Sequence, residues 1–156
     1  MNSNSFQLHR ITFLSCAFCT VLLIFRFYIA HNLDYLFMVW NLFLAIIPYA
    51  LSSWLLQTHW IKKQGFPLLL VLGFWLLFLP NAPYLITDLI HLRNTATSIL
   101  WLDLFMLFTF AWTGLLLGAI SMHQIFCVLT EKWNVTVAKR ILFMIVFLCG
   151  FGIYLG

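Results

Sequence analysis

The sequence predicts an all-α integral membrane protein, a helical bundle of about five transmembrane helices plus a short interfacial helix after a proline-broken span. The chain is 64% hydrophobic and 8% charged, whereas soluble domains are about half apolar and a quarter charged. Its apolar runs, such as 68–79 and 104–111, are continuous and do not alternate with polar residues. Because lipid offers no hydrogen-bond partners, continuous runs of this kind favour helices over a β-barrel.

The first two predicted spans cover residues 11–30 and 35–56. A helix of about 20 residues rises about 30 Å, which is enough to cross the hydrocarbon core of a bilayer. Arg26 lies near the far end of the first span, where it can reach the headgroups or pair with an acid. The second span is preceded by Asp34 and contains Pro48, which predicts a kink.

The third predicted span, residues 66–82, ends at a break that contains Pro80 and Pro83. Its apolar part rises only about 21 Å, less than the roughly 30 Å of a hydrocarbon core, so the break lies at membrane depth. Asn81 is a suitable N-cap for the next helix. We expect that helix over residues 82–93, either lying along the interface after a kink or forming the second half of a discontinuous helix.

The last two predicted spans cover residues 99–126 and 140–156. Gly114 and Gly118 form a G-x-x-x-G pattern, which is typical of close helix packing and predicts a partner helix within this chain or in another copy. The final apolar run, 141–155, rises about 22 Å and is again short of the hydrocarbon core. We therefore expect that the chain is a truncated form of a longer protein.

Lysine and arginine predict a cytoplasmic N-terminus. In that orientation the outer side holds only Arg26 and Arg93, and all other lysines and arginines lie inside, as the positive-inside rule requires. Asp34, Asp88 and Asp103 then all fall at the outer side. Since the net charge of +4 lies in the loops, it orients the protein, and we predict membrane lipids as partners and no nucleic-acid binding.

Ionisable side chains gather around the break. Asp88 and His91 are three residues apart, so on a helix both can face one ligand, with Asp88 orienting His91 as a general base. With Asp103 from the next span they are the candidate catalytic residues. Carboxylates and an imidazole also suit a divalent cation, but the spacing is weak, so we assign no metal, and the sequence leaves any cofactor unknown. Candidate ligand-binding or structural residues are Asn81, Tyr84, Thr87, Arg93, Arg26 and Asp34.

The same residues have a structural interpretation. The polar face of an interfacial helix can simply meet water or headgroups. Asp103 lies inside an apolar span, where an unpaired carboxylate costs roughly 2.5–3.5 kcal/mol, so it should have a cationic partner. Arg93 and Arg26 are the two candidates for that ion pair.

Several short motifs resemble those of one family: Leu79-Pro80-Asn81-Ala82-Pro83-Tyr84, Thr87-Asp88-Leu89, His91, Trp101-x-Asp103, Trp112-x-Gly114 and the ending Gly152-Ile153-Tyr154-Leu155-Gly156. On these motifs the sequence resembles the domain-of-unknown-function thirteen-sixty-one family of bacterial multi-pass membrane proteins. The resemblance spans most of the chain and implies a protein of the bacterial inner membrane with unknown activity. It also implies a continuation past Gly156 into an Arg-rich segment.

Three functions of different classes remain open, and the first is favoured. They are a structural or accessory membrane protein, a membrane-embedded enzyme that acts on a lipid or headgroup at the outer face of the cell membrane, and a small-solute transporter. An enzyme requires Asp88 and His91 in a cavity shared with Asp103. A transporter requires polar groups through the whole depth of the membrane, and the inner half offers few: Ser52, Ser53, Ser121 and His123.

Overall fold

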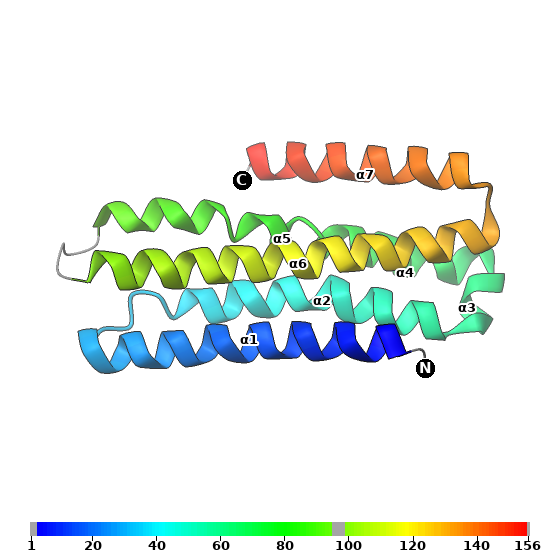
Figure 1. Cartoon of the computed structure of the whole chain (residues 1–156). Coiled ribbons are helices and arrows are strands. Elements are labelled where there is room, and N and C mark those ends of the chain that lie inside the picture. The colour runs from blue at the N-terminus through cyan, green and yellow to red at the C-terminus, as the bar shows by residue number, and fades with distance from the viewer. Residues whose placement is uncertain (1–2, 95–98, 156) are drawn as a thin grey trace.

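The computed structural model describes residues 3–94 and 99–155, and within these residues all regular structure is helical (Figure 1). The all-α prediction is therefore confirmed. The elements in chain order are α1 (Ser3–Ala30), α2 (Phe37–Gln57), α3 (His59–Lys63), α4 (Gly65–Phe78), α5 (Asn81–Tyr84), the 3-10 helix η1 (Thr87–Asn94), α6 (Leu100–Lys132) and α7 (Val135–Leu155).

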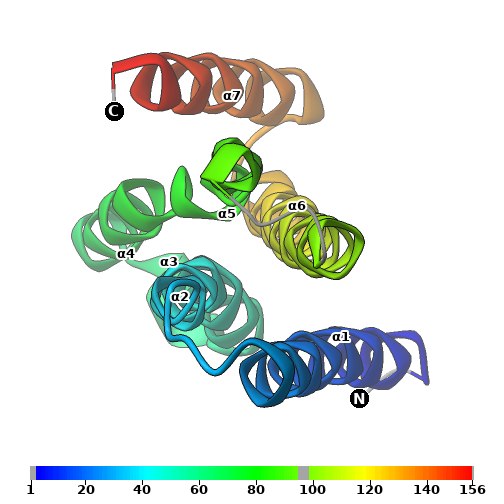
Figure 2. The ribbon, with the colours of Figure 1, turned by 90° about the vertical axis from the view of Figure 1, so that its left-hand side faces the viewer.

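Within residues 3–94 and 99–155, five helical segments are long and apolar enough to cross a membrane, so the chain is a multi-pass membrane protein. The long helices run side by side, with α1 and α7 on opposite sides of the bundle (Figures 1 and 2). α6 lies at the centre: half of its most apolar window is buried, compared with 17% for α1 and for α7. The five segments are Gln7–Ala30, Phe37–Gln57, Gly65–Ile90, Leu100–Lys132 and Val135–Gly152.

The third segment keeps its direction along the bundle after the break at Pro80 and Pro83. Gly65–Ile90 forms one candidate span, and Figure 1 shows α5 and η1 continuing alongside α6 instead of turning across the end of the bundle. This arrangement differs from the predicted interfacial α-helix over residues 82–93. Short turns keep the direction: the amide of Tyr84 donates to Pro80 at 3.1 Å and that of Ile86 to Pro83 at 3.0 Å.

The prediction that Asn81 caps the next helix is wrong. Asn81 is the first residue of α5, and its Nδ2 donates to the carbonyl of Phe78 at 3.0 Å. The physical reason lies in the preceding turn. The amide of Ala82, which would serve Phe78 in a continuous helix, instead donates to Leu79 at 3.1 Å, and the side chain of Asn81 satisfies the carbonyl left over.

The connections are shorter than the sequence suggested. α6 extends to Lys132 and α7 begins at Val135, so the connection between the predicted spans 99–126 and 140–156 shrinks to Trp133 and Asn134. Lys139 and Arg140 consequently belong to α7. With its 21 residues, α7 rises about 31 Å, which is longer than the roughly 22 Å of the apolar run 141–155.

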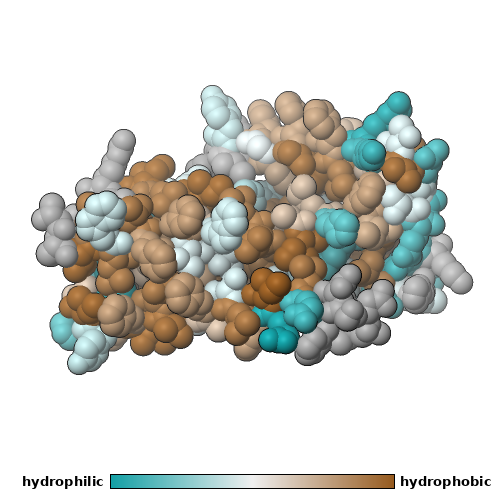
Figure 3. All heavy atoms as spheres, in the orientation of Figure 1, coloured by the Kyte–Doolittle hydropathy of each residue, from teal (hydrophilic) through white to brown (hydrophobic). Residues whose placement is uncertain are grey.

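The two ends of the bundle differ in charge. We call the end that carries Asp34, Asp88 and Asp103 the acidic end, and the end that carries Lys132 and Lys139 the basic end. Figure 3 shows hydrophilic residues gathered beside the α6–α7 turn at the basic end and a brown, hydrophobic band across the middle of the molecule. This distribution is that of a bundle whose middle lies in lipid.

Candidate functional site at the acidic end

Arg26 and Asp103 form a buried ion pair between α1 and α6. The Nε of Arg26 donates to Oδ1 of Asp103 at 3.1 Å, and Nη2 donates to Oδ2 at 3.4 Å. The two side chains are 4% and 0% exposed. Two-pronged pairing of this kind is the strong form of the arginine–carboxylate contact. Of the two cations proposed for Asp103, Arg26 therefore provides the pairing seen in the described residues.

The remaining hydrogen-bonding groups of Arg26 face the connection between α1 and α2. Nη1 donates to the backbone carbonyl of Asn32 at 3.3 Å and to the Oδ1 of the same residue. The guanidinium carbon lies 4.6 Å from the centre of the Tyr35 ring, in cation–π contact. Arg26 thus joins three parts of the chain: α1, the turn after it, and α6.

Asp88 forms a second polar link, between η1 and α2. Its Oδ2 accepts a hydrogen bond from Nδ2 of Asn41 at 3.0 Å, and the residue is only 3% exposed. The alternative in which this face meets water therefore does not hold for Asp88. The reason is the course of η1, which runs along α6 and brings Asp88 against α2.

The other predicted residues lie apart from these two links. Tyr84 is 37% exposed, and Thr87 donates to the carbonyl of Tyr84 at 2.7 Å, a purely local bond. Asp34 is exposed. The side chains of His91 and Arg93 lie outside the described residues, and so does the predicted triad of Asp88, His91 and Asp103 as a unit.

Neither Asp88 nor Asp103 lines either of two well-formed pockets among the described residues. One pocket, of about 220 Å³, lies beside the α1–α2 turn and includes Arg26, Asn32 and Tyr35 in its wall. The other, of about 330 Å³, lies between α7 and the middle of α6. Among the described side chains, no group of three or more His, Cys, Asp or Glu residues is arranged to hold a metal ion.

The glycine pattern of α6 packs against the break. A Cβ atom added to Gly118 would lie 3.1 Å from Cβ of Ala82, and one added to Gly114 would lie closer still to α5. Both glycines therefore face a partner within this chain. Since Gly114 lies near the middle of α6, the break lies near the middle of the span as well.

A third polar cluster joins α2, α4 and α6 in the half of the bundle toward the basic end. Ser121 Oγ donates to the carbonyl of Pro48 at 2.9 Å and accepts from Nε1 of Trp75 at 2.6 Å. Ser52 donates to Oε1 of Gln124 at 2.6 Å. All four side chains, those of Ser52, Trp75, Ser121 and Gln124, are buried.

Sequence reasoning identified Ser52 and Ser121 as polar groups of this half but missed Trp75 and Gln124. Gln124 had a signal, because it follows Ser121 by three residues and thus shares its helix face. Trp75 had none, because a tryptophan in an apolar run is indistinguishable from a lipid-facing one.

The comparison with family models identifies one family. The model described as Protein of unknown function (DUF1361) matches residues 40–156, most of the chain, from α2 to the end of α7. No curated protein and no solved structure matches. The matched part contains Asn41, Asp88 and Asp103. This multi-pass membrane protein therefore belongs to the DUF1361 family of proteins of unknown function.

Proposed function

We propose that this chain is a structural or accessory membrane protein whose buried polar contacts at the acidic end hold the bundle together. The observation that carries the proposal is the ion pair of Asp103 with Arg26, in which the carboxylate is 0% exposed and both its oxygens are engaged. An isolated carboxylate is costly in lipid, and paired acids commonly lie inside the bundle.

The surroundings of the two buried aspartates support a structural role over catalysis. A catalytic carboxylate must touch its substrate, and substrates bind in clefts or cavities. Asp103 and Asp88 line neither described pocket, and Asn41 holds Asp88 from α2. For an enzyme acting on a lipid headgroup, or for a solute transporter, these contacts would first have to open.

The proposal includes an orientation in the membrane. We place the basic end in the cytoplasm and the acidic end on the outer face of a bacterial inner membrane. The positive-inside rule supports this placement, because this end carries Lys62 in α3, Lys132 at the end of α6, and Lys139 and Arg140 near the start of α7. Bacterial origin is supported by the motif resemblance alone.

The structural role can be tested with three variants of the ion pair: Arg26→Met, Asp103→Leu, and the double variant. Breaking a buried pair on one side costs about 3–5 kcal/mol, whereas replacing both partners by apolar side chains is often neutral or stabilising. We therefore expect both single variants to unfold at markedly lower temperature in detergent and the double variant to recover. Arg10→Met, which removes an exposed arginine on the same helix, is the matched control.

The readout that separates the functions is complementation of a deletion strain by the same variants. A structural role predicts that the double variant restores both thermal stability and growth phenotype. If the double variant folds like wild type but does not complement, the carboxylate has chemistry of its own and the proposal is wrong.

A further inference from the structure

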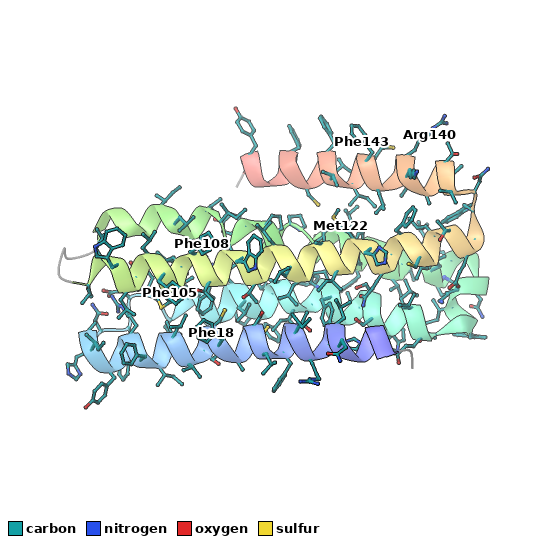
Figure 4. All side chains as sticks on the ribbon, in the orientation of Figure 1. Phe18, Phe105, Phe108, Met122, Arg140 and Phe143 are labelled. Atoms are coloured by element: carbon teal, nitrogen blue, oxygen red, sulfur yellow. The ribbon has the colours of Figure 1, made fainter. Side chains whose placement is uncertain are left out.

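The pocket between α6 and α7 is an apolar groove in the membrane-spanning part of the molecule. Its volume is about 330 Å³, and its wall includes Leu79, Pro83, Gly118, Met122, Val146 and Gly150. Met122 lies on α6 on the side that faces α7 (Figure 4). Apart from backbone atoms, the thiol of Cys149 is the polar group in this wall, so the wall is almost wholly apolar.

The surroundings of the groove define what can fill it. It lies beside the break of the third span and the middle of α6, at a depth where the solvent is hydrocarbon. An empty space would cost the lining its dispersion contacts, and water finds no partners in an apolar cavity. A lipid acyl chain would restore the dispersion contacts of the lining and needs no hydrogen-bond partner.

Lys139 lies on the same face of α7 as two residues of the groove wall, Val146 and Gly150. Lys139 precedes Val146 by seven residues and Gly150 by eleven, so each of the two lies within about 20° of Lys139 around α7. The rise from Lys139 to Gly150 is about 16 Å, close to half of a 30 Å hydrocarbon core. A lipid whose tail reaches Gly150 thus has its headgroup at the level of Lys139.

Charge complementarity indicates an anionic headgroup. Lys139 is exposed, and the ion pairs found among the described residues, Arg26–Asp103 and Lys62–Glu131, do not include it. The nearby Lys132 is engaged, because its Nζ donates to the carbonyl of Gln64 at 3.3 Å. A cation without an acidic partner at the membrane surface attracts anionic lipid.

We propose that the groove between α6 and α7 binds one anionic phospholipid. Its acyl chain lies along Met122, Val146 and Gly150, and its phosphate pairs with Lys139. Gly150 borders open space in the wall of the groove, because a Cβ added there meets no atom within 4 Å, so a larger side chain at this position can occupy the groove. The site lies on the opposite half of the molecule from the ion pair of Arg26 and is independent of it.

The test is native mass spectrometry of the purified full chain, titrated with phosphatidylglycerol or with phosphatidylcholine. Gly150→Leu fills the groove, and its matched control is Gly152→Leu on the same helix, where a Cβ also meets nothing within 4 Å. Lys139→Gln removes the cation, and its matched control is Arg140→Gln, one residue on and about 100° around the helix.

We expect one phosphatidylglycerol to bind wild type, Gly152→Leu and Arg140→Gln with similar affinity. Lys139→Gln should weaken that binding about fivefold, because one cation near a membrane surface contributes a binding free energy of about that size. Gly150→Leu should abolish the binding, while the melting temperature of this variant stays at or above that of wild type. The proposal is overturned if Gly150→Leu binds phosphatidylglycerol like wild type, or if phosphatidylcholine binds equally well and Lys139→Gln changes neither affinity.

Discussion

A Cβ atom on Gly114 would stand 2.5 Å from the carbonyl oxygen of Ala82 and 2.5 Å from a methyl group of Leu85. The centre of α6 therefore fits the broken third span only because this position lacks a side chain. Gly114→Ala should destabilise the bundle by about 1–3 kcal/mol or more, the usual cost of overpacking. Thermal unfolding of the purified protein in detergent measures the effect.

Gly118 and Gly73 provide comparisons for the effect of Gly114→Ala on stability. Gly118→Ala meets Cβ of Ala82 at 3.1 Å, so a smaller loss is expected, and Gly73→Ala meets nothing within 4 Å. Since alanine is the better helix former by about 1 kcal/mol, Gly73→Ala should be neutral or stabilising. Equal effects at Gly114 and Gly73 would show that the contact with the break does not limit packing.

Ser121 is the hub of the polar cluster that joins α2, α4 and α6. Ser121→Ala removes the partner of Trp75 Nε1 and of the Pro48 carbonyl at once. Hydrogen bonds between membrane helices average about 0.6 and reach about 1.7 kcal/mol, so a loss of about 1–3 kcal/mol is expected for the two bonds and the buried groups left unpaired. Unfolding in detergent with a graded denaturant measures it.

A double-variant cycle isolates the bond to Trp75. Trp75→Phe removes the donor and keeps an aromatic ring, so Ser121→Ala and Trp75→Phe together should cost less than the sum of the single effects. Strict additivity would mean that the hydrogen bond, although present at 2.6 Å, contributes nothing measurable to stability.

His31 ends α1 in a left-handed backbone conformation. Its φ is 50°, and its amide donates to the carbonyl of Phe27 at 2.9 Å. A non-glycine residue in this conformation costs roughly 1–2 kcal/mol, and glycine is the usual solution after a helix. His31→Gly should therefore raise the melting temperature, with a gain of up to about 1 kcal/mol.

The neighbouring position is the control for His31. Ala30→Gly places glycine at the last residue of α1, where its poorer helix propensity should cost up to about 1 kcal/mol. A destabilising His31→Gly would indicate that the imidazole contributes more than the backbone strain costs.

The proposed orientation predicts which cysteines can be labelled from outside intact cells. His31→Cys places a thiol in the exposed α1–α2 turn, and Asn134→Cys places one in the exposed α6–α7 turn. A membrane-impermeant maleimide should label the first and not the second. Wild type is the background control, since its own cysteines all lie within α1, α6 and α7. Labelling of Asn134→Cys alone would reverse the orientation.

The sequence was sufficient for the fold class but not for the fate of the third span. Composition and the apolar runs imply helices in lipid, and Pro80 with Pro83 implies a break. Whether the chain then lies along the surface or continues inward depends on what packs beside it, which local patterns do not contain. In the structure the chain continues inward after the break, because the close contact of Gly114 with Ala82 holds α5 within the bundle.

For the candidate site too, the sequence predicted some features and could not predict others. The cost of a carboxylate in lipid was enough to predict that Asp103 has a cationic partner, but Arg26 and Arg93 were equivalent by sequence alone. The structure pairs Asp103 with a residue 77 positions away. The burial of Asp88 was also invisible from the sequence, because it depends on Asn41 in another helix.

The carbonyl of Ala82 contacts α6, which follows the third span in the chain. When the third span leaves the ribosome, α6 has not yet been synthesised. Until α6 is made, the interrupted stretch packs against α2 on one side, but the side that α6 will cover faces lipid, which cannot satisfy irregular backbone. Residues 65–132 should therefore leave the translocon and enter the bilayer together, as one hairpin. The placement of Gly114 against Ala82 thus ties the architecture of the finished bundle to the sequence of events during its synthesis.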